Sequence, residues 1–268
     1  MRDIDEHTIT AAVLASLEAC DDQRLRQILG ALVSHLHDFV REVQLTEEEW
    51  LQGIRFLTAT GQACTDTRQE FILLSDTLGV SMLTVALNQR RSPAATEATV
   101  LGPFHVDDAP RAEQGHDIAA GAPGRPLDVD IVVRSSDGSP LAGADVDVWQ
   151  ADEDGLYDVQ AGTQRRARAL LKTDAEGRLR FRAIVPTGYP VPTDGPVGRM
   201  LVASGRHPWR PAHIHFIIKA QDHETLTTHL FREGDPYLDS DVVFGVRKSL
   251  VTKMDSGLTY TFVLDRKE

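Results

Sequence analysis

The sequence predicts an α+β protein, with a helical N-terminal region followed by a mainly antiparallel β-sandwich. Apolar residues recur at helical spacing up to about residue 90, and they alternate with polar residues after about residue 126. Pairs such as Asp137-Gly138 and Glu176-Gly177 separate the alternating runs. Short strands without helices between them favour a sandwich over a doubly wound sheet. We expect two domains, residues 1–95 and 96–268.

One long apolar stripe indicates a helix early in the chain. It comprises Leu25, Ile28, Leu29, Leu32, Val33, Leu36, Phe39, Val40 and Val43. A stripe of this width has to be buried against another surface. Two capping-box patterns, Thr46 with Glu49 and Thr67 with Glu70, predict later helix starts. The polar stretch 88–99, which contains Pro93, predicts a connector to the sandwich.

The strands of the sandwich are predicted by alternation of period two. Residues 127–131, 144–149 and 179–183 alternate in this way, and residues 259–264 form the expected last strand. If residues 213–216 also form a strand, the side chains of His213 and His215 point to the same face.

Composition and charge narrow the classes of function. The formal net charge of -12 disfavours binding to phosphate backbones, so we expect no nucleic acid partner. With only Cys20 and Cys64, a disulfide framework and a cysteine zinc site are disfavoured, and a reducing cytoplasm fits. No run of about 18 apolar residues occurs and residues 1–5 lack an apolar leader core, so we expect neither an integral membrane protein nor an exported one.

His213 and His215, together with Tyr157 and Tyr189, indicate a metal site. A lone His-x-His is weak, and a single loop tyrosine is more often a partly buried cover for a loop edge. Tyr189, however, lies among three prolines and a glycine that restrict its backbone. Two phenolates and two neutral imidazoles form a hard donor set that favours a trivalent cation, with ferric iron as the candidate.

Five ordered segments resemble the intradiol ring-cleaving dioxygenases of the catechol 1,2-dioxygenase type. They are residues 101–105, 148–152, 154–158, 184–190 and 210–216. The resemblance implies one Fe(III) per subunit, bound by Tyr157, Tyr189, His213 and His215, and O2-dependent cleavage of an aromatic diol to a muconate. It also implies that Tyr189 accepts a substrate proton and that Arg210 lies over the ring. A homodimer through the N-terminal stripe, with a lipid as a candidate occupant of its interface, completes what the resemblance implies.

Within that family, the chain is similar to the members that cleave hydroxyquinol (benzene-1,2,4-triol). The resemblance implies a substrate pocket of Leu73, Asp76, Gly102, Pro103, Phe104, Val191, Pro192, Arg210 and Val243. In this pocket Asp76 can accept a hydrogen bond from the third hydroxyl group, although a carboxylate on a helix surface is an equal alternative. His229 stands where many catechol-cleaving relatives carry glutamine, beside the iron and the arginine, and its role is left open.

Three alternatives for the function and one for the oligomeric state stay open at this point. The same reaction could act on catechol or a chlorocatechol, and a transthyretin-like or carbohydrate-binding sandwich could lack catalysis altogether. A zinc hydrolase is disfavoured because no carboxylate or third histidine with ligand spacing accompanies the pair. A monomer whose helices pack on its own sandwich competes with the homodimer.

Overall fold

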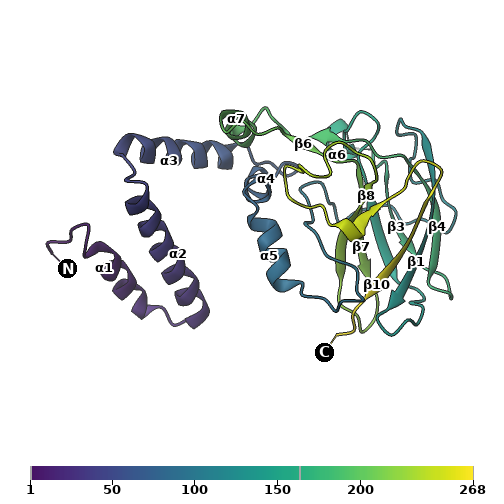
Figure 1. Cartoon of the computed structure of the whole chain (residues 1–268), viewed down its shortest axis with the longest axis horizontal. Helices are drawn as coiled ribbons and strands as arrows, with labels where there is room; N and C mark the ends of the chain where they lie inside the picture. Colours follow the sequence, from purple (N-terminus) through teal and green to yellow (C-terminus); the bar gives the residue numbers. More distant parts are fainter. Residues whose placement is uncertain (1, 163, 268) are drawn as a thin grey trace. The chain divides into compact units, whose positions relative to one another are not determined.

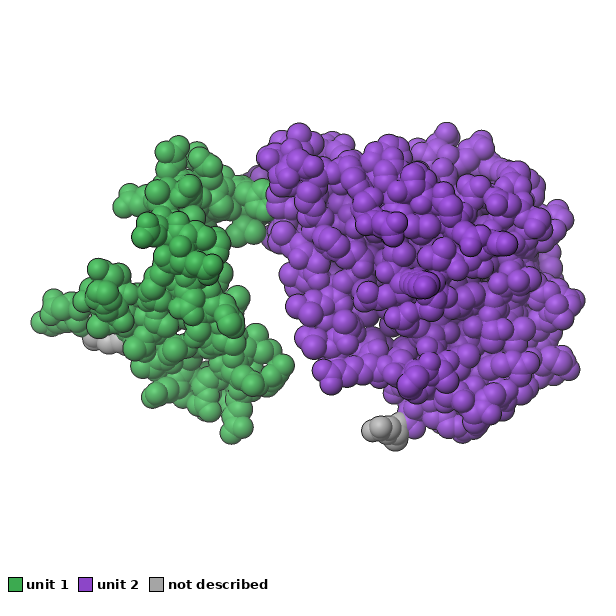
Figure 2. All heavy atoms as spheres, viewed as in Figure 1, with its two compact units in different colours: residues 1–58 green, residues 59–268 purple. Residues whose placement is uncertain are grey.

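The computed structural model describes residues 2–162 and 164–267, which form two compact units. The first unit ends at Thr58 and the second begins at Ala59 (Figure 2). This boundary lies before the expected one at residue 95, because two further helices pack within the second unit. These helices, α4 (Glu70–Thr77) and α5 (Val80–Asn88), bury Leu73 and Met82 in one apolar cluster with Val197 and Val243.

The first unit is helical, as its apolar stripe predicts. It contains α1 (Ile9–Ser16), the 3-10 turn η1 (Leu17–Ala19), α2 (Gln23–Glu42) and most of α3 (Glu47–Gln62) (Figure 1). The carboxylate of Asp22 caps α2 by accepting a hydrogen bond of 2.9 Å from the backbone N–H of Leu25. The predicted capping box of α3 is confirmed, since the Thr46 N–H donates to the Glu49 carboxylate and the Glu49 N–H donates to Thr46 Oγ1.

The second predicted capping box is wrong. Helix α4 begins at Glu70, with Gln69 rather than Thr67 at the cap. The Glu70 carboxylate is buried and accepts hydrogen bonds from the backbone N–H of Val197 (3.1 Å) and from Nε of Arg68 (2.9 Å). The Glu70 carboxylate, which the local pattern predicted to cap the helix start, thus binds groups outside the predicted capping box instead.

Two sheets form the sandwich of the second unit. One has the strand order β10-β1-β4 and the other β3-β2-β7-β8-β9. Their bounds are β1 (Pro126–Ser135), β2 (Asp145–Trp149), β3 (Arg168–Lys172), β4 (Arg178–Ile184), β7 (His213–Lys219), β8 (Leu226–Arg232), β9 (Val251–Thr252) and β10 (Leu258–Leu264). The four predicted strands are therefore confirmed as β1, β2, β4 and β10. Pairing is mainly antiparallel, with parallel pairs at β1–β10 and β8–β9.

The core of the sandwich lies between the two sheets. Inward residues of β1 and β10, such as Ile131 and Phe262, belong to the same buried cluster as Val148 of β2 and Phe216 of β7. The connector after α5 has no helix or strand before β1, as expected. Among the described residues, no single helix is both long and apolar enough to cross a bilayer. Helices α4 and α5 are long and apolar enough only when they are taken together, and the chain bends by 77° between them.

Candidate metal centre

The two tyrosines come from turns that the sequence shapes closely. Tyr157 follows a turn in which Gly155 has φ of 78°, and a Cβ atom at Gly155 would lie 2.6 Å from Cβ of Tyr189. Tyr157 then caps the short helix α6 (Asp158–Ala161), where its backbone N–H donates to Oε1 of Gln160. Tyr189 begins β5 (Tyr189–Pro190), which pairs with β6 (Trp209–Arg210). Both tyrosines are buried.

The two histidines lie on β7, where alternation places both imidazoles on one side of the strand. His215 is paired with Trp149 of β2 and with His229 of β8. Nδ1 of His213 lies 2.6 Å from the carbonyl oxygen of Pro211, to which it donates its hydrogen. Nε2 of His213 is therefore the nitrogen without a hydrogen, and it lies 3.1 Å from Nε2 of His215.

The structure brings together the side-chain donors of all four residues. The Tyr157 oxygen lies 2.8 Å from Nε2 of His215, 3.5 Å from Nε2 of His213 and 3.0 Å from the Tyr189 oxygen. The Tyr189 oxygen lies 3.4 Å from Nε2 of His213. Imidazole and oxygen ligands stand about 2 Å from a bound transition metal, so neighbouring ligand atoms of one ion are separated by about 3 Å. The four groups fit a shared cation.

Burial sets the ionisation of this donor set. It lowers the pKa of His213 and of His215, which keeps both imidazoles in the neutral, metal-binding form. Burial also raises the pKa of both tyrosines, and the neighbouring Tyr189 adds to the increase at Tyr157. The phenols would therefore ionise only with a cation bound between them.

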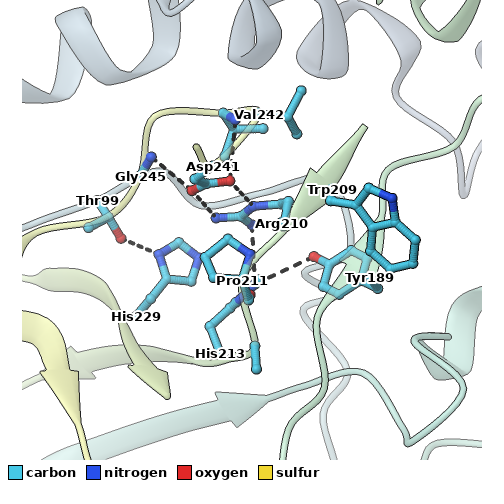
Figure 3. A network of polar contacts seen from close by, with 12 residues as sticks. Thr99, Tyr189, Trp209, Arg210, Pro211, His213, His229, Asp241, Val242 and Gly245 are labelled. Carbon is cyan, nitrogen blue, oxygen red and sulfur yellow. Dashed lines mark hydrogen bonds and ion pairs between the residues drawn. The ribbon is translucent and has the colours of Figure 1, made fainter. Parts of the chain in front are cut away.

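Arg210 is fixed at the edge of this centre by a carboxylate. Its Nε lies 3.1 Å from Asp241 Oδ1, and its Nη1 lies 3.1 Å from Nε2 of His213 (Figure 3). Asp241 Oδ2 also accepts the backbone N–H of Gly245 at 3.0 Å. Burial lowers the pKa of Arg210, but the charge and hydrogen bond of Asp241, together with the charges of Tyr189 and Tyr157, outweigh burial and raise the pKa. The sequence reasoning missed Asp241, although it begins the Asp-Val-Val segment from which Val243 was taken.

His229 gives the centre a third histidine. The ligand nitrogens of His213, His215 and His229 lie within 4.8 Å of one another, which corrects the expectation that no third histidine accompanies the pair. Nδ1 of His229 is hydrogen-bonded to Thr99 Oγ1, and the ring is fully buried (Figure 3). The two tyrosine oxygens lie 2.8 to 3.5 Å from Nε2 of the His213–His215 pair and can supply two anionic ligands. We therefore favour the set of two histidines and two tyrosines over a three-histidine zinc site.

Several of the expected pocket residues lie together in the structure. Leu73, Val191 and Val243 belong to one buried apolar cluster. A cavity of about 400 Å³ is lined in part by Leu73, Pro103, Phe104 and Pro192.

Two of the pocket segments also contact the tyrosine and histidine rings directly. The Phe104 ring stacks on Tyr157 with 4.5 Å between centroids. A Cβ atom on Gly102, where φ is 78°, would lie 3.2 Å from Cε1 of His215, so a side chain there would press on the imidazole. The loop from residue 102 to 104 thus forms one wall beside the donor set.

Asp76 lies in the interior and not on a helix surface. It is 2% exposed on α4, and its charge interacts with those of Arg210 and Asp241. Burial raises the pKa of Asp76, and the charge of Asp241 adds to the increase. A hydrogen bond from Ser81 and the charge of Arg210 act in the opposite direction. The carboxyl group is thus a buried polar group beside the arginine.

The fold and the site together define a class of protein: a β-sandwich with an N-terminal helical unit and a buried centre of two histidines and two tyrosines. The C-terminal part, residues 100–264, matches the family described as "Dioxygenase", and residues 22–96 match "Catechol dioxygenase N terminus". The chain belongs to the family of intradiol ring-cleavage dioxygenases, and it is an enzyme of that type.

Similar proteins come from several bacteria. The chain is 58% identical to the 6-chlorohydroxyquinol 1,2-dioxygenase of Cupriavidus pinatubonensis, over 94% of this chain and 92% of that protein. It is 52% identical to the hydroxyquinol 1,2-dioxygenase of Corynebacterium glutamicum, over 93% and 84%. The crystal structure of hydroxyquinol 1,2-dioxygenase from Pseudomonas putida DLL-E4 matches with a TM-score of 0.89 and 46% identity, over 98% of this chain and 99% of that one.

Proposed function

We propose that the protein cleaves hydroxyquinol between its two adjacent hydroxyl-bearing carbons with O2 and Fe(III). Both oxygen atoms enter the product, 3-hydroxy-cis,cis-muconate, which ketonises to maleylacetate. The observation that carries the proposal is the convergence of the Tyr157 and Tyr189 oxygens with Nε2 of His213 and His215. The relatives named hydroxyquinol and 6-chlorohydroxyquinol 1,2-dioxygenases support the choice of substrate.

Tyr157, Tyr189, His213 and His215 would hold one Fe(III) per subunit. When bound, the iron supplies the charge that ionises the two phenols and the positions that a diol can chelate. The donor set is hard and carries two negative charges, which stabilises the trivalent over the divalent ion. It contrasts with the 2-His-1-carboxylate set of ferrous oxygenases.

Two side chains of the centre have proposed roles in the reaction. The phenolate oxygen of Tyr189 accepts a proton from a substrate hydroxyl group as a general base. The guanidinium group of Arg210, always charged and held by Asp241, stabilises negative charge as it develops on the ring. Arg210 already lies beside the donor set, with its Nη1 3.1 Å from Nε2 of His213.

Specificity for the third hydroxyl group is assigned to Asp76. A buried carboxylate can accept several hydrogen bonds; Asp76 accepts one from Ser81, and the extra hydroxyl of hydroxyquinol offers a further donor that catechol lacks. Leu73, Val191 and Val243 supply the apolar contacts to the ring. A site built to bind a hydroxyl group discriminates against the analogue without it, since the polar group then loses that hydrogen bond.

The test is oxygen uptake by the iron-loaded protein with hydroxyquinol, 6-chlorohydroxyquinol and catechol in parallel, with the non-enzymatic oxidation of each substrate subtracted. We expect the highest kcat/KM with one of the two hydroxyquinols. A preference for catechol would keep the iron chemistry and remove the pocket assignment. A purified protein that takes up no iron, and therefore shows no tyrosinate-to-iron band in the visible spectrum, would contradict the proposed ferric site.

Replacing Asp76 with Ala separates recognition from chemistry. A lost hydrogen bond to a charged acceptor is worth about 1.5 to 3 kcal/mol, so kcat/KM for hydroxyquinol should fall by about 10- to 150-fold. Turnover of catechol should fall much less. Equal losses with both substrates would contradict the role of Asp76 in recognition.

The proposed partners are a small aromatic diol or triol, O2 and a second copy of the chain. Large apolar side chains of α2 and α3, including Leu32, Phe39 and Trp50, are exposed within the first unit, which supports a homodimer through these helices. The lipid and the cytoplasmic location suggested by the sequence stay predictions.

A further inference from the structure

A buried ion pair lies beside Tyr157 and takes no part in the proposed reaction. It joins Arg168, the first residue of β3, to Asp158, the first residue of α6, and both are at most 4% exposed. Nε of Arg168 donates to Asp158 Oδ2 at 2.8 Å, and Nη2 donates to Oδ1. The desolvation of two buried charges largely offsets their attraction, so stability alone does not explain such a pair.

The ion pair connects two segments that reach the centre. Nη2 of Arg168 also donates to the carbonyl oxygen of Phe104 at 3.1 Å. Asp158 Oδ1 accepts the backbone N–H of Val159 at 2.9 Å, which fixes the start of α6 directly after Tyr157. The guanidinium group therefore ties the segment with Phe104 to the turn with Tyr157, at the point where the two rings stack with an interplanar angle of 24°.

The same arginine is adjacent to the support of His215. In the β2–β3 ladder Arg168 is the register partner of Trp149. The Trp149 ring stacks on His215, with 4.6 Å between centroids and an angle of 16°. The segment that Arg168 holds through the Phe104 carbonyl also includes Gly102, which approaches Cε1 of His215. The Arg168 guanidinium group thus contacts segments that lie against two of the four donors, Tyr157 and His215.

We propose that Arg168 and Asp158 are positioning residues: they fix the Tyr157 oxygen relative to Nε2 of His215 and hold the Phe104 wall of the pocket. The inference rests on the proposed roles of Tyr157 in metal binding and of Phe104 in substrate binding. A buried, bidentate pair suits this task because its planar fork fixes direction as well as distance. Metal ligands bind well only when their own orientation is fixed by such neighbours.

The test uses the full chain with the paired substitution Arg168→Met/Asp158→Asn, which leaves no unpaired charge in the interior. The matched control is Arg182→Met/Asp128→Asn, which removes a solvent-exposed ion pair of 3.2 Å between β4 and β1. Hydrogen exchange of the iron-free protein is followed in peptides covering residues 101–106 and 153–160. The iron-loaded protein is then examined for its tyrosinate-to-iron band and for its hydroxyquinol-to-catechol preference.

We expect exchange at least about tenfold faster in both peptides of the Arg168 variant, with the strands of the sandwich unchanged. The tyrosinate-to-iron band should shift and weaken, and the preference for hydroxyquinol over catechol should become smaller. Arg168→Lys should restore protection in residues 153–160 but not in 101–106, because one ammonium group cannot serve Asp158 and the Phe104 carbonyl in the same fork geometry.

Hydrogen exchange and a visible band equal to those of the control variant would overturn the inference. Faster exchange spread evenly over the whole second unit would overturn it as well, because it would show that the Arg168–Asp158 pair only stabilises the fold. The exchange measurement needs no iron. If the wild-type protein shows no visible band, the proposed function fails, while the exchange pattern still decides whether Arg168 orders these two segments.

Discussion

The position of Arg210 depends on a single carboxylate. Asp241→Asn removes the charge that Arg210 faces and weakens the acceptor for the Gly245 N–H, while the shape of the side chain is kept. Because it leaves a buried arginine unpaired, we expect the free energy of unfolding to fall by about 3 kcal/mol. Oxygen uptake should fall as well, through kcat more than KM. The control is Asp239→Asn in the same loop, which is exposed and should change neither urea unfolding nor uptake; equal effects of both variants would contradict the role of Asp241.

Asp76 predicts an unusual pH dependence of stability. Burial raises its pKa above the ordinary 3.8, so the folded protein binds this proton at a higher pH than the unfolded chain does. The carboxylate therefore lowers stability at neutral pH, and this loss disappears as the pH falls through the folded-state pKa towards 3.8. Asp76→Asn should raise the melting temperature at pH 7.5, and the gain should shrink towards pH 4. A gain that grows on acidification would show that the pKa of Asp76 is lowered instead.

At the scale of single residues, local sequence was informative where the geometry is local. Strand alternation was enough to place His213 and His215 on one face. Asp241 and Thr99 reach the centre through loops and strand neighbours far along the chain, and nothing in their own sequence surroundings marks them. The role of Arg168 could not be predicted from the sequence for the same reason, because its partners are a helix start and a carbonyl group in another segment.

At the scale of elements, the two capping-box patterns show when a local rule holds. The Thr46 and Glu49 side chains are exposed and hydrogen-bond each other, whereas the Glu70 carboxylate accepts hydrogen bonds from Val197 and Arg68. Strand predictions succeeded since alternation reflects burial of one face directly. The domain boundary differed because α4 and α5 look like other amphipathic helices, and only their packing against Val197 and Val243 assigns them to the second unit.

This contrast predicts different effects of two similar substitutions. Thr46→Ala removes the acceptor for the Glu49 N–H, so amides in the first turn of α3 should exchange about fivefold faster, the usual effect of losing an N-terminal cap. Thr67→Ala should leave the first turn of α4 unchanged, since Gln69 stands at its cap. Hydrogen exchange measured by mass spectrometry checks both. Faster exchange in α4 of the Thr67 variant would indicate that its capping box forms in solution after all.

At the scale of the whole molecule, the first unit presents an apolar face that the single chain leaves open. Leu32 and Phe39 of α2 are each 50% exposed and Trp50 of α3 is 56% exposed, which is costly in water unless a second surface covers them. We expect a homodimer with twice the chain mass of 29.5 kDa in sedimentation velocity. With a net charge of -12 on each chain, moderate salt should strengthen the association by screening the repulsion.

The double variant Leu32→Glu/Phe39→Glu should shift the sedimenting species to the monomer, because it buries two carboxylates in any interface built on this face. Gln27→Glu, which adds the same kind of charge at an exposed polar position of α2, is the control and should remain dimeric. Because the proposed metal donors all lie in the second unit, iron content should be equal in the three proteins. If the wild-type protein is a monomer and its organic extract contains a lipid, then a lipid and not a second chain covers this face. A wild-type monomer without extractable lipid would show that the exposed side chains tolerate water, and the homodimer would then be rejected.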